Sequence, residues 1–362
     1  MGTFNVREVR GEEDIGLFLD LPKQLHGRAS NQDDAVVSQF LKGTHPLSDD
    51  AAIRHYLLEG SGEVKGRMTL TRYDGEDTLY LGFFECIDEQ AAADALFRQA
   101  MESAEKNGLK SVTGPMDVSF WIGYRFKTSN FDRVFFGEPE NPPYYPKLFE
   151  GGGFRTLARY GSHYYRSMPL DHELDKFRQR RTLARERGVR IIHPDRKGFD
   201  RILDDLHLML MELYQDFPGF QSITLKDFKK IYGRLKLVAD PQFIVLAYEG
   251  DEPLGFCIAF PDYGDRLNKG SSIHKLLALY RTKRKPKGVV LAYTGVRKGH
   301  EGLGGAMLHE LLSILKERQL PAVAALIQEG KVTAGFEKEL IEDRTEYRLY
   351  RKLLKGDESD DF

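Results

Sequence analysis

The chain has 362 residues, of which 41% are hydrophobic and 30% are charged, and its formal net charge is -2. This balance is typical of a globular protein, and the length suits two domains. The near-neutral charge argues against a nucleic acid or an anionic membrane as a partner. Two cysteines, Cys86 and Cys257, form neither a disulfide framework nor a metal-spaced pair. With no run of about 18 apolar residues and no apolar signal region at the start, we expect a cytoplasmic protein without a metal.

The first part of the chain predicts alternating strands and helices. We expect a helix over Ala51–Leu58, strands over Lys65–Thr71 and Thr78–Cys86, and a short strand that begins at Ser111. Between these strands, the three- and four-residue spacing of apolar side chains in Gln90–Glu105 indicates an amphipathic helix.

An aromatic segment over residues 117–146 follows, and its apolar side chains show no period. A stretch of this length and composition inside a compact domain is usually functional or closely packed. We expect it to cover a core or to line a cleft with Phe120, Trp121, Tyr124, Phe126, Phe131, Phe135 and Phe136.

The same order of elements starts again after a basic segment over residues 171–190, which predicts a solvated helical linker. The second series contains a helix, a hairpin, a long apolar strand over Val289–Val296, a helix over Leu303–Arg318 and a strand over Ala322–Ile327. The predicted division is therefore a first domain over 1–170, the linker over 171–190, a second domain over 191–355 and an acidic tail over 356–362.

The stretch with the clearest chemistry joins the long strand to the next helix, over residues 294–307. Glycines at the start of a helix let a bulky anion approach backbone N–H groups and the positive end of the helix dipole. We therefore predict a diphosphate site here, and its candidate residues are Thr294, Val296, Arg297, Lys298, Gly302, Leu303, Gly304, Gly305 and Ala306.

A glycine-rich turn that merely permits tight packing of strand and helix would also explain these glycines. The lysine and the serine or threonine of a P-loop are absent, and the glycine spacing of a dinucleotide fold does not fit.

The strand, the run Gly302–Leu308 and the following helix resemble the acyl-CoA-binding motif of the GCN5-related N-acetyltransferase (GNAT) superfamily. The resemblance implies an α/β (α+β) fold of tandem GNAT-like domains, with mixed, mostly antiparallel sheets, a splayed central pair of strands and flanking helices. The runs Gly82–Cys86 and Asn141–Tyr145 are also similar to a bacterial family of tandem GNAT-like proteins. One departure is Gly299, which stands where the motif has Gln or Arg; Arg297 or Lys298 could replace that cation.

The first half departs further from this motif. Asp88 and Glu89 follow its long strand where the resemblance calls for a glycine loop, and acidic residues at a helix start repel a diphosphate. We therefore expect no cofactor site in the first half.

Catalytic residues follow only from the resemblance, which implies a glutamate on the long strand as base and a tyrosine in a late helix as acid. The matching residues of the first half are Glu85, Tyr144 and Tyr145, and in the second half Glu329 ends the strand beside the long strand.

The leading hypothesis is an N-acyltransferase that uses acetyl-CoA or another acyl-CoA to modify a small-molecule or peptide amine in a cleft between the halves. The alternative is a degenerate, non-catalytic tandem GNAT protein that binds an acyl-CoA or a partner as a sensor.

Overall fold

The computed structural model describes residues 3–27, 33–195, 199–267, 272–330 and 336–354. The strands in these ranges form one sheet in the order β1-β2-β3-β4-β5-β13-β7-β12-β11-β10-β9-β8, and β6 pairs with β13. Only β4–β5 and β11–β12 pair in parallel among the described strands. The prediction of a mixed, mostly antiparallel sheet with flanking helices is confirmed.

The first series of elements is β1 (Asn5–Glu8), α1 (Gly11–His26), α2 (Asp34–Leu41), β2 (Ala52–Gly60), β3 (Glu63–Arg72), β4 (Thr78–Cys86), α3 (Gln90–Lys106), β5 (Ser111–Gly114), β6 (Phe126–Lys127), α4 (Tyr145–Gly151) and β7 (Arg155–Tyr165). The second series is α5 (Asp175–Glu186), β8 (Arg190–Ile192), α6 (Phe199–Leu213), α7 (Leu225–Tyr232), α8 (Leu235–Val238), β9 (Ile244–Glu249), β10 (Glu252–Pro261), α9 (Ser272–Arg284), β11 (Val289–Val296), α10 (Leu303–Glu317), β12 (Ala322–Gln328) and β13 (Ile341–Leu353). Short 3₁₀ turns cover Pro241–Phe243 and Lys338–Leu340.

The helix expected over Ala51–Leu58 is wrong, because these residues belong to the strand β2. Tyr56 and Leu58 pack in the core under α3, whereas Leu57 packs in the core on the other face of the sheet. Both faces of this strand are covered, so its apolar residues are consecutive and the two-residue alternation of a half-exposed strand is lost.

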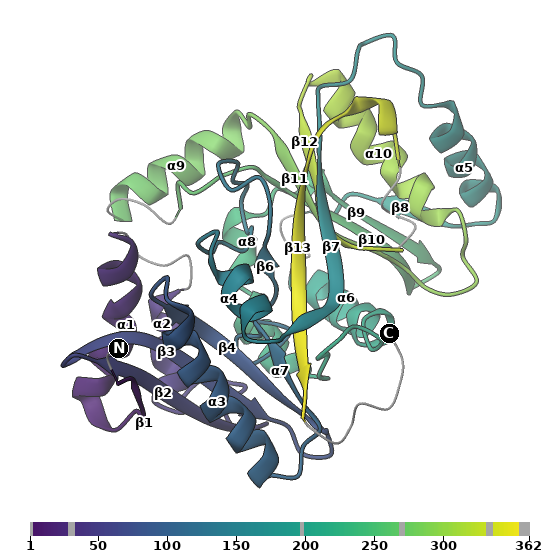
Figure 1. Cartoon of the computed structure of the whole chain (residues 1–362). Coiled ribbons are helices and arrows are strands. Elements are labelled where there is room, and N and C mark those ends of the chain that lie inside the picture. The colour runs from purple at the N-terminus through teal and green to yellow at the C-terminus, as the bar shows by residue number, and fades with distance from the viewer. Residues whose placement is uncertain (1–2, 28–32, 196–198, 268–271, 331–335, 355–362) are drawn as a thin grey trace.

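The last strand of each half completes the sheet of the other half. Strand β13, from the end of the chain, pairs with β5, and β7, from the first half, pairs with β12. The two strands also pair with each other in the middle of the molecule, where Figure 1 shows them as the longest pair. Residues 155–165 and 341–353 therefore belong in space to the opposite half from the one in which the sequence places them.

Residues 171–190 contain the helix α5, which packs against α10 and buries Phe177 and Ala184 in the core of the second half. Its cationic residues remain exposed, and Arg181 pairs with Glu310 of α10. The basic segment is thus an additional helical layer over the cofactor-site candidate as well as a connection.

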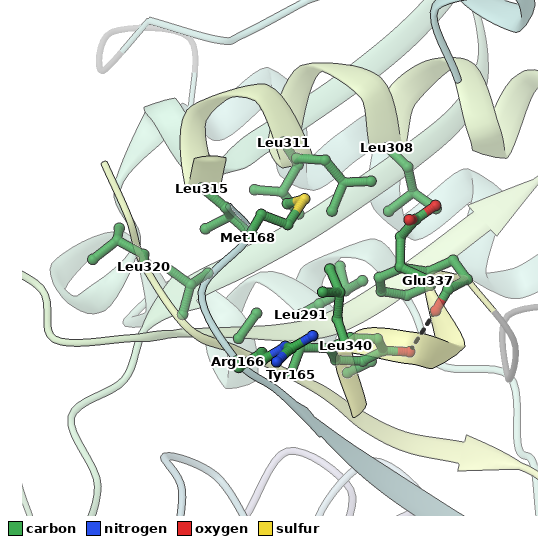
Figure 2. Close-up of a pocket in the computed structure, with 15 residues that line it drawn as sticks. Tyr165, Arg166, Met168, Leu291, Leu308, Leu311, Leu315, Leu320, Glu337 and Leu340 are labelled. Carbon is green, nitrogen blue, oxygen red and sulfur yellow. Dashed lines mark hydrogen bonds between the residues drawn. The ribbon is translucent and has the colours of Figure 1, made fainter. Parts of the chain in front are cut away.

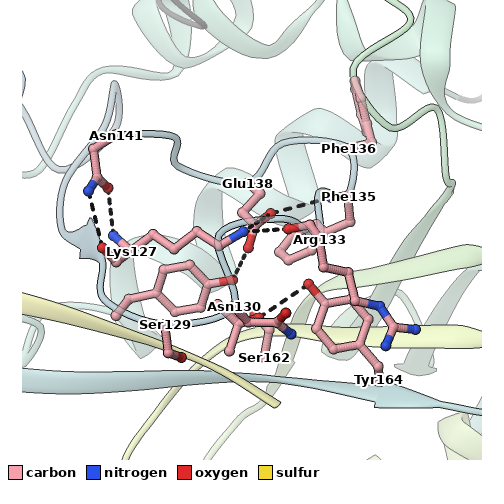
Figure 3. A network of polar contacts seen from close by, with 12 residues as sticks. Lys127, Ser129, Asn130, Arg133, Phe135, Phe136, Glu138, Asn141, Ser162 and Tyr164 are labelled. Carbon is pink, nitrogen blue, oxygen red and sulfur yellow. Dashed lines mark hydrogen bonds and ion pairs between the residues drawn. The ribbon is translucent and has the colours of Figure 1, made fainter. Parts of the chain in front are cut away.

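The aromatic segment 117–146 is held on β13 by a buried polar network (Figure 3). Lys127 Nζ lies 3.1 Å from Glu138 Oε2, and both residues are at most 5% exposed. Tyr347 of β13 donates a hydrogen bond to Glu138, and the Lys127 ammonium also donates to the Arg133 carbonyl. A buried ion pair is retained at low cost only when hydrogen bonds satisfy it in this way.

The strand exchange predicts that the halves do not fold separately. A fragment of residues 1–170 loses the partners of β5 and β7, so its exposed sheet edges should leave it largely unfolded. Circular dichroism and amide-proton NMR dispersion measure this, and addition of a fragment of residues 171–362 should restore the dispersed spectrum. A well-dispersed spectrum with a cooperative thermal transition for residues 1–170 alone would contradict the prediction.

Candidate functional site

The glycine junction of the second half connects β11 to α10. Gly302 is the residue before α10 and has φ 90° and ψ -18°. Residues other than glycine adopt this left-handed backbone conformation only at a cost in free energy. A Cβ atom placed on Gly304 would meet only Val296 Cγ2, at the ordinary distance of 3.5 Å. Val296 is therefore the one side chain that covers Gly304 on this side of the helix, among the described residues.

Two backbone N–H groups at the helix start have no backbone acceptor among the described residues. The amide of Leu303 donates to the carbonyl of His300 at 3.1 Å, and the amide of Ala306 donates to Gly302 at 3.1 Å. For Gly304 and Gly305, the described residues provide no backbone acceptor, as expected in the first turn of a helix. These two amides lie at the positive end of the helix dipole.

The cations around the junction differ in their availability. Arg297 is already paired, because its guanidinium lies 2.7 Å from Glu212 Oε2 and 2.6 Å from Glu252 Oε1. Lys298 is exposed. Arg180 of α5 lies against Gly305, where its side chain would be 2.6 Å from an added Cβ atom. The cation that tertiary structure adds to the junction is thus Arg180, which the sequence assigned only to the linker.

Strands β11 and β12 diverge beside this junction. Their parallel pairing covers Val289–Leu291 and Ala322–Ala324 and goes no further along the described strands. At the same level β12 has a register shift, and Leu326 has φ 57°. The later part of β11, which includes Thr294 and Val296, therefore has no strand partner on its β12 side among the residues that the structure describes.

The corresponding place in the first half is filled. Strand pairing shows which residues of the two halves correspond. Cys86 of β4 pairs with Gly66 of β3, and Val296 of β11 pairs in the same way with Gly255 of β10. The Cys86 amide donates to the hydroxyl of Tyr145 at 3.2 Å, and this hydroxyl donates to Glu85 Oε2 at 2.5 Å. Tyr144 donates to the carbonyl of Cys86 at 2.8 Å. The end of β4 is therefore closed by the protein's own side chains.

Two further residues complete this cluster, and sequence analysis did not select them. His26 Nε2 lies 2.9 Å from Glu85 Oε2, and the buried Arg67 lies 3.7 Å from Glu85 Oε1 and over the ring of Phe18. Burial and the charge of Glu85 raise the pKa of Tyr145 well above its usual range. The available signal was Arg67 itself, a cation within the predicted strand Lys65–Thr71.

The remaining candidates lie apart from this cluster. Glu329 is largely exposed and lies 3.9 Å from Arg159. Asp88 and Glu89 are exposed at the start of α3, where their charges oppose an anionic ligand as expected.

One group of potential metal ligands occurs among the described residues. His172, Glu337 and Glu339 bring their ligand atoms within 4.8 Å of one another. The ammonium of Lys176 lies 2.6 Å from Glu337 Oε1 and competes with any cation for that carboxylate. Burial opposes ionisation of Glu337, but hydrogen bonds from Lys176 and His172 hold its pKa below the usual range. The arrangement is explained by internal ion pairs.

A small cavity lies between α10 and the sheet (Figure 2). Its volume of about 20 Å³ is enough for one water molecule, and apolar side chains line most of it, among them leucines of α10 and β11. Glu337 stands at one side of it. This cavity is too small for a cofactor, so the junction of β11 and α10 remains the candidate cofactor site.

Comparison with solved structures identifies the class of fold. A tandem GNAT protein from the clavulanic acid biosynthesis pathway, solved without acetyl-CoA, is 14% identical, with a TM-score of 0.50, and the match covers 98% of this chain and 99% of that protein. A GCN5-related N-acetyltransferase from Sphaerobacter thermophilus gives a TM-score of 0.44 at 12% identity, with 97% and 96% of the two chains covered. A GCN5-related N-acetyltransferase from Kribbella flavida gives 0.48 at 10% identity, with 98% and 71% covered.

The chain has the GNAT fold, an acyl-CoA N-acyltransferase fold. More particularly, it has the fold of a tandem GNAT protein over its whole length, which confirms the expected resemblance at the level of fold. No family model and no curated protein matches the sequence. Within the described residues, we find no helix with the length and apolar character needed to cross a membrane.

The closed cluster of the first half yields a stability prediction. Tyr145→Phe removes the hydroxyl that connects Glu85 to the Cys86 amide and leaves both without this partner. We expect a loss of about 1–3 kcal/mol in the free energy of unfolding, measured by denaturant titration. The matched variant Tyr144→Phe, which removes a hydroxyl that donates to the Cys86 carbonyl and makes no hydrogen bond to Glu85 among the described residues, should lose less. Equal stabilities for wild type and Tyr145→Phe would show that the cluster contributes no stability.

Proposed function

We propose that this protein is an acyl-CoA-dependent N-acyltransferase with one cofactor site, at the junction of β11 and α10. The observation that supports this proposal is the difference between the halves of one tandem fold. The second half has an open helix start with available amides, whereas Tyr145, Glu85 and the acids at the start of α3 occupy or oppose that place in the first half.

The residues of the junction suit a diphosphate. Gly304 and Gly305 would offer their amides, and Lys298 and Arg180 would supply side-chain charge, in the role that Arg297 cannot fill while it is paired with Glu212 and Glu252. A bound acyl-CoA supplies an activated acyl thioester. The Val296 amide, which corresponds to the Cys86 amide bound by Tyr145, would then be free to hold the thioester carbonyl.

The acceptor in this proposal is a small-molecule or peptide amine, and the compartment is the cytoplasm. The amine would approach β11 from the face of the sheet opposite α10, where the aromatic segment 117–146 covers the second half. Because Glu85 and Tyr145 are engaged with each other in the first half, we do not assign either of them as the catalytic base or acid.

The second candidate function is a sensor that binds an acyl-CoA without turnover. It is favoured by the burial of the acid-base candidates Glu85 and Tyr145 and by the exposed position of Glu329. Release of free thiol from acetyl-CoA with a panel of amines separates the two functions, because a sensor releases none above background.

Calorimetric titration with coenzyme A tests the site directly. We expect one molecule bound per chain. Gly304→Leu should weaken binding at least tenfold, because the new side chain would fill the space beside Val296. Neutralising Lys298 with Gln should weaken binding by about two- to fivefold, as for one partly screened charge at a helix start.

The control for Lys298→Gln is Lys285→Gln, an exposed lysine beyond the end of α9, which should leave the affinity unchanged. Circular dichroism should show that Gly304→Leu keeps the fold. Absence of binding by wild type at millimolar coenzyme A, or two molecules bound per chain, would refute the proposed site.

A further inference from the structure

Arg125 extends from the aromatic segment of the first half onto a strand of the second. Its backbone has φ 72°, and its amide donates to the carbonyl of Pro115 at 3.1 Å. One terminal nitrogen of the guanidinium donates to the carbonyl of Leu326 at 3.3 Å. Leu326 lies on β12 just beyond the point where this strand leaves β11. The cation is therefore beside the same divergence of strands that adjoins the proposed cofactor site.

The guanidinium lies against two tyrosine rings and is not fully satisfied. Its central carbon is 4.0 Å from the ring centre of Tyr124 and 4.4 Å from that of Tyr160. The Nε atom of Arg125 is buried, and no acceptor for it exists among the described residues. Buried donors without an acceptor are rare in folded proteins and call for an explanation. The residue as a whole is only half-buried.

The surroundings of Arg125 are aromatic, and the described residues place no carboxylate in an ion pair with its positive charge. Phe120 stacks on Tyr124, and Tyr214 stacks on Phe217. Tyr293 of β11 is 37% exposed; burial of its hydroxyl raises its pKa, and the charge of Arg125 partly offsets that shift. No ion pair of Arg125 with a carboxylate is found among the described residues.

The alternation of side chains between the two faces of β11 shows on which face of the sheet Arg125 lies relative to α10. Val289 and Leu291 pack in the core beneath α10, whereas Val290 packs with Tyr160 in the core on the other face. Arg125, which contacts Tyr160, therefore lies on the face opposite α10. A cofactor at the start of α10 and a ligand at Arg125 would meet across the diverging strands.

We propose that Arg125 is the specificity-determining residue of the acceptor site, a proposal that rests on the function proposed above. The acceptor is then a small amine that also carries a carboxylate. A guanidinium offers two parallel donors that match the geometry of a carboxylate. A single cation beside aromatic side chains matches the one charge of a carboxylate better than the two charges of a phosphate dianion. The contact with Leu326 and the two rings would by themselves hold the halves together, but they leave the Nε donor unexplained.

Ligand-observed NMR on the full chain tests this proposal with three matched probes. L-Phenylalanine has a ring, an amine and a carboxylate, 2-phenylethylamine lacks the carboxylate, and 3-phenylpropionate lacks the amine. We expect phenylalanine and phenylpropionate to bind wild type at least tenfold more tightly than phenylethylamine. Arg125→Gln should abolish this preference. Arg133→Gln is the matched control, because Arg133 also lies 4.0 Å over a tyrosine ring, that of Tyr164, and it should keep the preference.

The proposal is overturned if all three probes bind wild type equally, if none binds, or if Arg125→Gln retains the preference. Because the first two outcomes need only wild-type protein, the test does not depend on the folding of the variant. Thiol release from acetyl-CoA distinguishes the failure of the two proposals. Equal release with phenylalanine and phenylethylamine would refute carboxylate recognition and leave acyl transfer standing. Carboxylate-dependent binding without thiol release would refute acyl transfer and leave carboxylate recognition standing.

Discussion

The antiparallel pairing of β7 with β13 is the interaction on which the rest of the structure depends. Ten residue pairs join the two strands, from Ile341 with Tyr165 to Arg351 with Arg155. Since each strand also completes the sheet of the opposite half, neither half has a full set of strand partners without the other. The buried contact of Tyr347 with Glu138 then fixes the aromatic segment 117–146 on this pair, and through it Arg125 on the second half.

Two equivalent places in one fold thus have opposite properties. In the first half, side chains of the protein use the donors and acceptors at the end of β4, and acidic residues begin the next helix. In the second half, the strand edge and the helix start remain available, and cations from the junction and from α5 lie beside them.

Much of the local structure was determined by the sequence alone. The limits of β4, β11 and α3 agree with the predicted ones within a residue, because continuous apolar runs and three- to four-residue spacing are strong local signals. The glycines before α10 and the acids before α3 also indicated the asymmetry of charge and space between the halves, since both effects act within one turn of a helix.

Tertiary structure alone decided the exchange of β7 and β13, the pairing of Arg297 with two glutamates and the place of Arg125 beside β12. Each of these depends on partners distant in the chain: Arg125 and Leu326, for example, are 201 residues apart. No local period or propensity encodes such a choice. It is made by the free energy of the complete fold, in which sheet edges must be paired and buried charges must find partners.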